Sequence, residues 1–304
     1  MITTTLKKEA YDMSITAAEA SELFRRDPDR YIDTGDGEVA YRTVGSGPDV
    51  LFVHGWPVSS ATFRTLLPHL TDHVTCHLID LPGAGSSRFS HDTPLSIANH
   101  IRSVRAVVDH LQLDGVAVVG HDSGGLIARH ALAGDPRLRA LGLIDTEQTG
   151  RPGWRFRAFL AGRHLPGYGA VLGWVAGRPR IRRSQLVLGG AFANRDLLDG
   201  EFDEFFLQPL TRSSEHRRAT TRLLRSFDYE LIRDLPDLHS KLNVPVKLVW
   251  GAGDVFFPVA GAREMVNTFP QATLEVIDGA ALFAHEERPA DVARALLPIL
   301  TGTP

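Results

Sequence analysis

The chain has 304 residues, of which 43% are hydrophobic and 23% charged, and its formal net charge is −3 at pH 7. This length suits one sheet-based core with a helical lid, and the small negative charge gives no sign of nucleic acid or an anionic membrane as a partner. A single cysteine, Cys76, excludes an internal disulfide framework, and no segment approaches the roughly 20 apolar residues of a membrane span. We therefore expect a cytoplasmic protein.

The N-terminal segment, residues 1–30, lacks a signal-peptide core and is predicted to be a helical extension. Thr16 and Glu19 are spaced as in a capping box, which predicts a helix that runs to about Arg26. This helix would pack either on a helical cap formed later in the chain or on a second subunit, and the second alternative would make the protein a homodimer.

Two apolar strands are predicted in the next part of the chain. Residues 51–53 form a short apolar run that leads into the sequence His-Gly-Trp-Pro at 54–57. Residues 73–81 form a second apolar pattern, followed by Gly-Ala-Gly at 83–85. No G-x-G-x-x-G sequence follows a strand, so these glycines indicate a loop and not a phosphate-binding turn.

The most informative segment is residues 120–124, Gly-His-Asp-Ser-Gly, which follows the apolar run 116–119. The spacing is that of a nucleophile elbow, a strained turn between a strand and a helix in which the glycines relieve close backbone contacts. Asp122 occupies the tip. Ser123 lies one residue beyond it, which disfavours an esterase that uses this serine.

An aspartate at the tip predicts a different chemistry from a serine. A carboxyl group with a reference pKa of about 3.9 is ionised at neutral pH, so Asp122 can attack a strained or halogenated carbon without a base to deprotonate it. Hydrolysis of the resulting alkyl ester, in contrast, needs a water molecule that a general base activates.

The later part of the chain is predicted to hold a helical cap at 147–240, between a strand at 141–146 and a late strand that begins near Val244. The late strand ends shortly before Asp254. This acid either orients a catalytic base or caps the turn that follows it.

These motifs, in this order, resemble the α/β-hydrolase fold over residues 31–300. The aspartate at the elbow and the His-Gly-Trp-Pro turn are most similar to its epoxide hydrolase and haloalkane dehalogenase branch. The resemblance implies a doubly wound, mostly parallel sheet built from 31–146 and 241–304, with the inserted cap at 147–240. It also implies an oxyanion hole made by the backbone N–H groups of Trp56 and Ser123.

One position departs from the pattern of this branch. The base histidine of such enzymes lies in a segment of the form G-x-G-H-F-x-x-E-x-x-P, and residues 279–289 place Leu282 at that position. His285 follows three residues later, which on a helix is nearly the same face, so it is either a substitute base or a structural residue. Without a base, alkylation of Asp122 would proceed while hydrolysis of the ester would stall.

The resemblance also suggests which residues surround a substrate. Haloalkane dehalogenases tend to carry a tryptophan after the nucleophile, and Ser123 departs from this. Epoxide hydrolases tend to use cap tyrosines to protonate the opening oxygen. The predicted catalytic residues are Asp122, Asp254 and His285, and the predicted pocket residues are His54, His121, Trp154, Tyr168, Tyr229 and Leu282. His54 and His121 are also candidates for structural hydrogen bonding within the frame of the fold.

Two functions remain open at this point. The first is a hydrolase that opens an epoxide or a carbon–halogen bond through Asp122. The second is a hydrolase-fold protein that has lost hydrolysis and acts as a binding protein, or as an isomerase or cyclase. Either would act on a small hydrophobic molecule, and we expect no cofactor or metal because the histidines lack H-E-x-x-H spacing.

Overall fold

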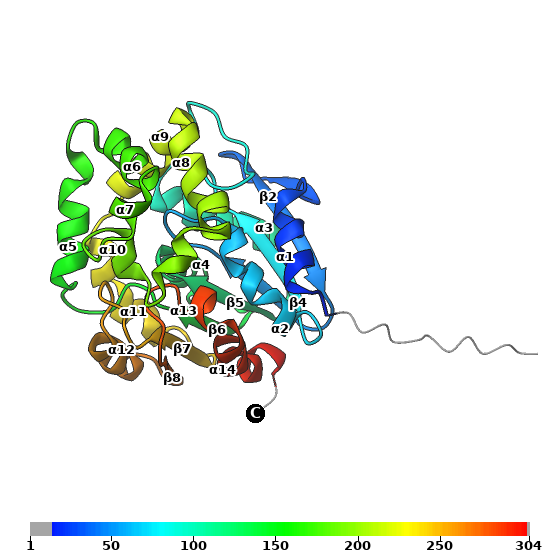
Figure 1. Ribbon diagram of the computed structural model, residues 1–304. Coiled ribbons are helices and arrows are strands. Elements are labelled where there is room, and N and C mark those ends of the chain that lie inside the picture. Colours follow the sequence, from blue (N-terminus) through cyan, green and yellow to red (C-terminus); the bar gives the residue numbers. More distant parts are fainter. Residues whose placement is uncertain (1–13, 303–304) are drawn as a thin grey trace, which may run out of the picture.

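The computed structural model describes residues 14–302, which are organised around one eight-stranded sheet (Figure 1). The strand order is β1-β2-β4-β3-β5-β6-β7-β8. β1 and β2 are antiparallel to each other, β2 is antiparallel to β4, and every other neighbouring pair is parallel. The strands are β1 (Arg30–Asp33), β2 (Glu38–Gly45), β3 (Asp49–Val53), β4 (Thr75–Asp80), β5 (Val116–His121), β6 (Leu138–Ile144), β7 (Val246–Gly251) and β8 (Ala272–Ile277). The predicted mostly parallel, doubly wound sheet is confirmed.

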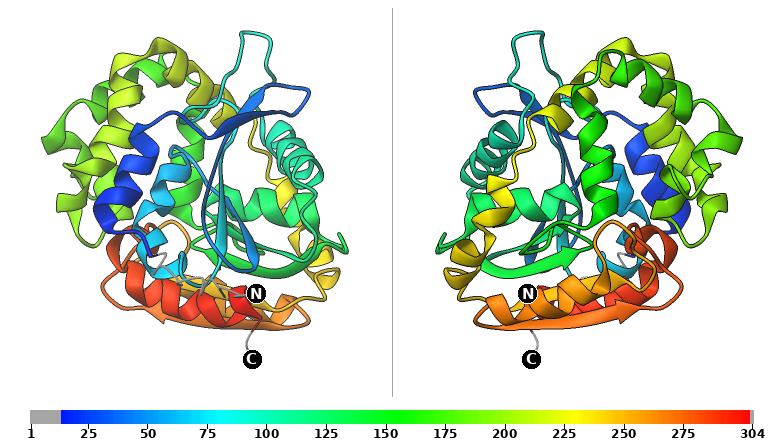
Figure 2. Two further views of the ribbon diagram at one scale, coloured as in Figure 1. Left: turned by 90° about the vertical axis from the view of Figure 1, so that its right-hand side faces the viewer. Right: turned by 90° about the vertical axis from the view of Figure 1, so that its left-hand side faces the viewer.

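Helices cover both faces of the sheet. One layer contains α3 (Ile97–His110), α4 (Ser123–Leu132), α11 (Leu235–Ser240) and α12 (Val259–Met265). The other contains α1 (Ala17–Arg25), α2 (Leu67–Leu70), α13 (Ala284–Glu287) and α14 (Pro289–Thr301). Both views of Figure 2 show α14 beside the β8 edge. Because β5 lies between β3 and β6 under both layers, all six of its residues are buried, which explains the unbroken apolar run in the sequence.

The chain between β6 and β7 forms an insertion of short helices, drawn in green to yellow in Figures 1 and 2. It comprises α5 (Trp154–Ala161), α6 (Tyr168–Ala176), α7 (Pro179–Arg182), α8 (Gln208–Arg212), α9 (Ser214–Arg225) and α10 (Glu230–Arg233), and the chain returns to the sheet through α11. Whether residues 147–240 are a separate cap domain stays a prediction.

Two predicted strand limits need correction. The strand predicted at 141–146 is β6, which begins at Leu138 and ends at Ile144. It ends there because Asp145 has a φ of 37°, a left-handed value that an extended strand does not allow. The late strand begins at Val246, two residues after the predicted start.

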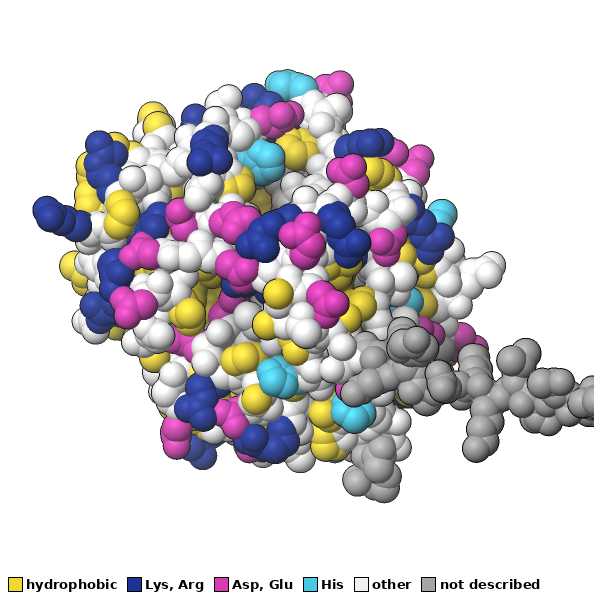
Figure 3. Space-filling view, turned by 45° about the vertical axis from the view of Figure 1, so that its right-hand side comes forward, with side chains coloured by type: hydrophobic (Ala, Val, Ile, Leu, Met, Phe, Trp, Pro, Cys, Tyr) yellow, Lys and Arg dark blue, Asp and Glu magenta, His cyan; other side chains and the backbone are white. Residues whose placement is uncertain are grey.

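The helix predicted near the N-terminus is α1, and Thr16 and Glu19 form the predicted capping box. It packs against the 3₁₀ helix η1 (Ser60–Thr65), and its Arg25 forms ion pairs with Glu201 and Glu204 of the insertion. Residues 1–13 of the predicted extension lie outside the described part of the chain. On the face drawn in Figure 3, acidic and basic side chains are interspersed. Within residues 14–302, no helix is long and apolar enough to cross a membrane.

Candidate active site

Asp122 occupies the turn between β5 and α4, as the sequence predicted. Its backbone has φ 50° and ψ −134°, a conformation that is strained for a residue with a side chain. The glycines on either side allow close packing. A Cβ atom at Gly120 would lie 2.6 Å from the Cα of Gly125, and one at Gly124 would lie 2.1 Å from the carbonyl oxygen of Val53. Asp122 is thus held at the tip by contacts that only these small residues permit.

The carboxylate of Asp122 accepts hydrogen bonds from the two backbone groups that were predicted to form an oxyanion hole. The N–H of Trp56 donates to Oδ2 over 2.8 Å, and the N–H of Ser123 also donates to this carboxylate. If the other carboxylate oxygen were alkylated, Oδ2 would become the carbonyl oxygen of an ester. The same N–H groups would then face the oxygen on which charge develops during hydrolysis.

A cavity of about 380 Å³ lies above Asp122, between the carboxyl end of the sheet and the insertion. Its volume is within the range of pockets for small ligands, and its wall is mostly aromatic and aliphatic. Of the predicted pocket residues, Trp154, Tyr168 and Leu282 line it, together with Trp56 and Ser123.

The other predicted pocket residues do not line this cavity. His54 accepts a hydrogen bond from the N–H of Leu81 through Nε2, and His121 donates through Nε2 to the carbonyl oxygen of Leu282. Both rings are buried and both have a pKa below the ordinary value, because burial disfavours the charged form. They stabilise the frame of the site. Tyr229 is largely exposed and packs edge-on against Phe227.

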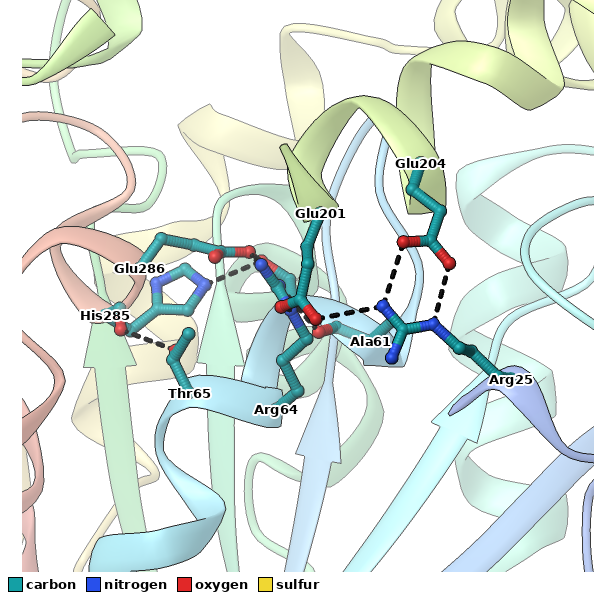
Figure 4. Close-up of polar contacts among 9 residues, drawn as sticks. Arg25, Ala61, Arg64, Thr65, Glu201, Glu204, His285 and Glu286 are labelled. Atoms are coloured by element: carbon teal, nitrogen blue, oxygen red, sulfur yellow. Dashed lines mark hydrogen bonds and ion pairs between the residues drawn. The ribbon is translucent and has the colours of Figure 1, made fainter. Parts of the chain in front are cut away.

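His285 is fully buried outside the cavity wall (Figure 4). Its Nε2 lies 2.8 Å from the hydroxyl of Thr62, and its backbone carbonyl accepts a hydrogen bond from Thr65. The adjacent Glu286 forms a buried ion pair with Arg64 at 2.8 Å. Burial is the main cause that holds the pKa of His285 well below its ordinary value, so the ring is neutral.

The placement of His285 corrects the expectation that it lies on the same face as Leu282. That argument assumed one continuous helix, but α13 begins at Ala284, after Leu282. The two side chains therefore separate: Leu282 faces the cavity and His285 faces the core. Of the two predicted roles for His285, the structural role fits this geometry.

Asp254 lies after β7, and its loop runs beside the segment that holds Leu282. The N–H of Gly253 donates to the carbonyl oxygen of Ala280 over 2.8 Å, as expected for neighbouring loops at one sheet edge. Oδ1 of Asp254 accepts from the N–H groups of Phe256 and Phe257, which is the predicted capping role. Oδ2 is buried and has no hydrogen-bond partner among the described residues.

Comparison with known proteins identifies the family. The family model described as "alpha/beta hydrolase fold" matches residues 48–289. The chain belongs to this family. The α/β-hydrolase is 28% identical over 278 residues to a pimeloyl-[acyl-carrier protein] methyl ester esterase from Xanthomonas campestris, which covers 84% of this chain and 98% of the relative. It is 27% identical to the magnesium-chelatase 30 kDa subunit of Rhodobacter capsulatus, over 89% of this chain and 90% of the relative.

Solved structures share the fold of this α/β-hydrolase. An ancestral haloalkane dehalogenase superposes with a TM-score of 0.75 at 23% identity, covering 90% of this chain and 98% of that chain. A hydrolase-fold protein from Burkholderia ambifaria gives a TM-score of 0.73 at 22% identity, with the same coverage of each chain.

The site of this α/β-hydrolase contains two acids that the sequence analysis missed, Asp145 and Glu147. Asp145 is fully buried; its Oδ1 accepts a hydrogen bond from the N–H of Gly251, and the N–H of Ala284 also acts on its carboxylate. Glu147 is also buried and lines the cavity together with Asp122. The available signal was the sequence Asp-Thr-Glu at the end of a predicted parallel strand, since strand ends build sites in such folds.

The carboxyl groups of this α/β-hydrolase are crowded. Burial raises the pKa of Asp122 well above its ordinary value, the charge of Glu147 raises it further, and the two backbone N–H donors oppose this. Burial likewise raises the pKa of Glu147, and raises that of Asp254 to about 7. Each of these acids is therefore a site where a proton can be held near neutral pH.

Proposed function

We propose that the protein is an enzyme of the epoxide hydrolase and haloalkane dehalogenase type. In it, Asp122 attacks an electrophilic carbon of a small hydrophobic molecule and forms an alkyl ester. The main support is the position of Asp122 at the elbow tip, with one carboxylate oxygen held by two N–H groups below an apolar cavity.

The first step follows from this arrangement. The free carboxylate oxygen of Asp122 forms a bond to carbon while the carbon–oxygen bond of an epoxide, or a carbon–halogen bond, breaks. The mostly apolar wall of the cavity favours a hydrophobic substrate. No base is required, because the attacking group is a carboxylate.

The second step is where this site departs from the motif of the branch that the sequence resembles. Hydrolysis requires a group that takes a proton from water, and Leu282 lies at the position expected for histidine. The buried Oδ2 of Asp254, which has no hydrogen-bond partner among the described residues, marks an acid without an imidazole to orient. Loss of a general base typically costs about 10²–10⁴ in rate, so we expect a slow second step.

The esterase relatives suggest acyl transfer, which would require a serine at the elbow tip. Ser123 is the first residue of α4 and contributes its backbone N–H to the Asp122 carboxylate. The Ser123 hydroxyl therefore lies one residue beyond the tip of the turn, which Asp122 occupies. Ester formation on Asp122 therefore agrees better with the geometry than an acyl-serine does.

A second candidate function is a protein that has lost hydrolysis and acts as a binding protein, or as an isomerase or cyclase, on a small hydrophobic molecule. Leu282 in the cavity wall and the burial of His285 favour it. The relative from Rhodobacter capsulatus also supports it, because its name describes a magnesium-chelatase subunit and not a hydrolase.

Intact mass spectrometry separates the two candidates. The protein is incubated with 1,2-epoxyhexane or 1-bromohexane, which share one carbon chain and differ in the leaving group. Alkylation adds the mass of one reagent-derived group to the wild type and none to Asp122→Asn, the neutral variant of similar shape. Absence of any adduct and of any product, with both reagents and over a range of chain lengths, would favour the second candidate.

A further inference from the structure

Asp122 and Glu147 are two buried carboxyl groups that line one cavity. They come from adjacent strands, since Asp122 follows β5 and Glu147 lies just beyond β6. The hydroxyl of Thr146 connects them: it lies 2.7 Å from the carbonyl oxygen of Asp122 and 3.1 Å from Oε2 of Glu147. Glu147 exposes only 1% of its surface, so bulk water does not solvate its charge.

The groups packed around this pair do not neutralise two negative charges. Arg129 of α4 is the nearby cation, but its guanidinium bonds the backbone carbonyl of Glu147 and the Thr146 hydroxyl and not either carboxylate. Asp145 precedes Glu147 by two residues, and Asp254 acts on the charge of Asp122, so both add further acids. Arg155 and Tyr168 also line the cavity, and the Arg155 guanidinium donates to the backbone carbonyl of Gln185. Burial and the charge of Glu147 raise the pKa of Asp122, and burial raises the pKa of Glu147, so a proton on one of the two carboxyl groups is favoured.

We propose that Glu147 is the proton-transfer residue of this site and that the substrate is an epoxide rather than an alkyl halide. This inference rests on the proposed function of Asp122. In the reactive form Asp122 is ionised, with its charge stabilised by the N–H groups of Trp56 and Ser123, and Glu147 carries the proton.

Asp122 and Glu147 can together supply and accept every proton that the hydrolysis of an epoxide requires. Asp122 forms its bond to carbon while the ring carbon–oxygen bond breaks, and the opening oxygen takes the proton of Glu147. The Glu147 carboxylate then accepts a proton from water as the water oxygen attacks the carbonyl carbon of the ester. Collapse of the intermediate breaks the bond between that carbonyl carbon and the ester oxygen, and the departing alkoxide takes the proton back from Glu147. The Asp122 carboxyl finally passes its proton to Glu147, which restores the starting pair.

An alkyl halide does not complete this cycle. A halide ion leaves without a proton, so Glu147 is still protonated after alkylation and must first lose its proton to solvent before it can take one from water. The ester on Asp122 should then accumulate. The identity of the leaving group therefore decides whether the missing histidine matters.

The test compares 1,2-epoxyhexane with 1-bromohexane on the wild type and on Glu147→Gln. We expect the wild type to release the diol from the epoxide and to accumulate a hexyl ester from the bromide. In Glu147→Gln, the diol should form at least about 100-fold more slowly, whereas alkylation by the bromide should persist. Glu275→Gln, a change of the same type on the exposed side of β8, is the control and should behave as the wild type.

The pH profile of the wild type tests the same proposal without a variant. Ester formation from the epoxide needs one proton on the pair, so its rate should fall on both the acidic and the alkaline side. Alkylation by the bromide needs only ionised Asp122, so its rate should rise with pH to a plateau. Equal profiles, equal release of both products, or unimpaired diol formation by a folded Glu147→Gln would overturn the role of Glu147. If neither reagent modifies Asp122, the proposed function itself fails.

Discussion

Leu282→His should supply a histidine base at the position where the family motif places one. Leu282 lines the cavity with Asp122, and the loop beside it holds Asp254, whose Oδ2 is buried without a hydrogen-bond partner in the described residues. An imidazole at 282 would bring an N–H group to this part of the site. An acid that holds an imidazole in position is the arrangement that general-base hydrolysis of an ester requires.

Two opposing contributions set the folding stability of Leu282→His. Leu282 is 8% exposed, so its replacement gives up most of the roughly 1.5–3 kcal/mol that burial of a leucine contributes. A hydrogen bond to a charged carboxylate returns about 1.5–3 kcal/mol, so the variant should fold with at most a modestly lower melting temperature. Its gain in ester hydrolysis should be about 10²–10⁴-fold.

The assay is a single-turnover measurement. The wild type and Leu282→His are alkylated with 1-bromohexane, freed of excess reagent, and followed by intact mass as the hexyl adduct disappears. Leu282→Asn, which is polar but not basic, is the matched control and should retain the adduct. If Leu282→His folds and is alkylated but keeps its adduct as long as the wild type does, the reasoning about position 282 is refuted.

Three further outcomes follow from the structure. His285→Ala should leave alkylation of Asp122 unchanged and lower the free energy of unfolding by about 1–3 kcal/mol, because it removes a buried ring bonded to Thr62; lost alkylation in a folded variant would contradict this. Arg64→Met should cost about 3–5 kcal/mol in urea unfolding, since Glu286 would be left as an unpaired buried charge; a change near zero would contradict it. Burial raises the pKa of Asp254 to about 7 in the folded state from 3.8, so its contribution to stability is complete below pH 3.8 and is lost as pH rises through about 7. The wild type should therefore lose stability between pH 5 and pH 8, whereas Asp254→Asn should not. The melting temperature of the variant should rise relative to that of the wild type over this range, and a constant difference would argue against a raised pKa.

The nucleophile turn could be predicted from sequence because its determinants are local. The apolar run before it indicates a fully buried strand, and the two glycines allow the backbone contacts that the turn requires. The assignment of Leu282 to the pocket followed from a resemblance to a family motif, and Leu282 does line one cavity with Asp122.

The parts that escaped prediction depend on tertiary contacts. Glu147 approaches Asp122 only because β6 pairs with β5, and the expected end of that strand was two residues too late. The direction of His285 depends on where α13 begins and on its bond to Thr62, which is distant in sequence. Neither contact is accompanied by a periodic pattern in the sequence, so a single sequence does not predict it.

The most direct test of the central claim is a single turnover of 1,2-epoxyhexane in water enriched in oxygen-18, with the protein in excess over the epoxide. If Asp122 forms an ester that water cleaves at the carbonyl carbon, the heavy oxygen enters the Asp122 carboxylate, and the peptide that contains Asp122 gains its mass while the diol stays unlabelled. Heavy oxygen in the diol, with an unlabelled Asp122 peptide, would show that water attacks the substrate directly and would contradict the account.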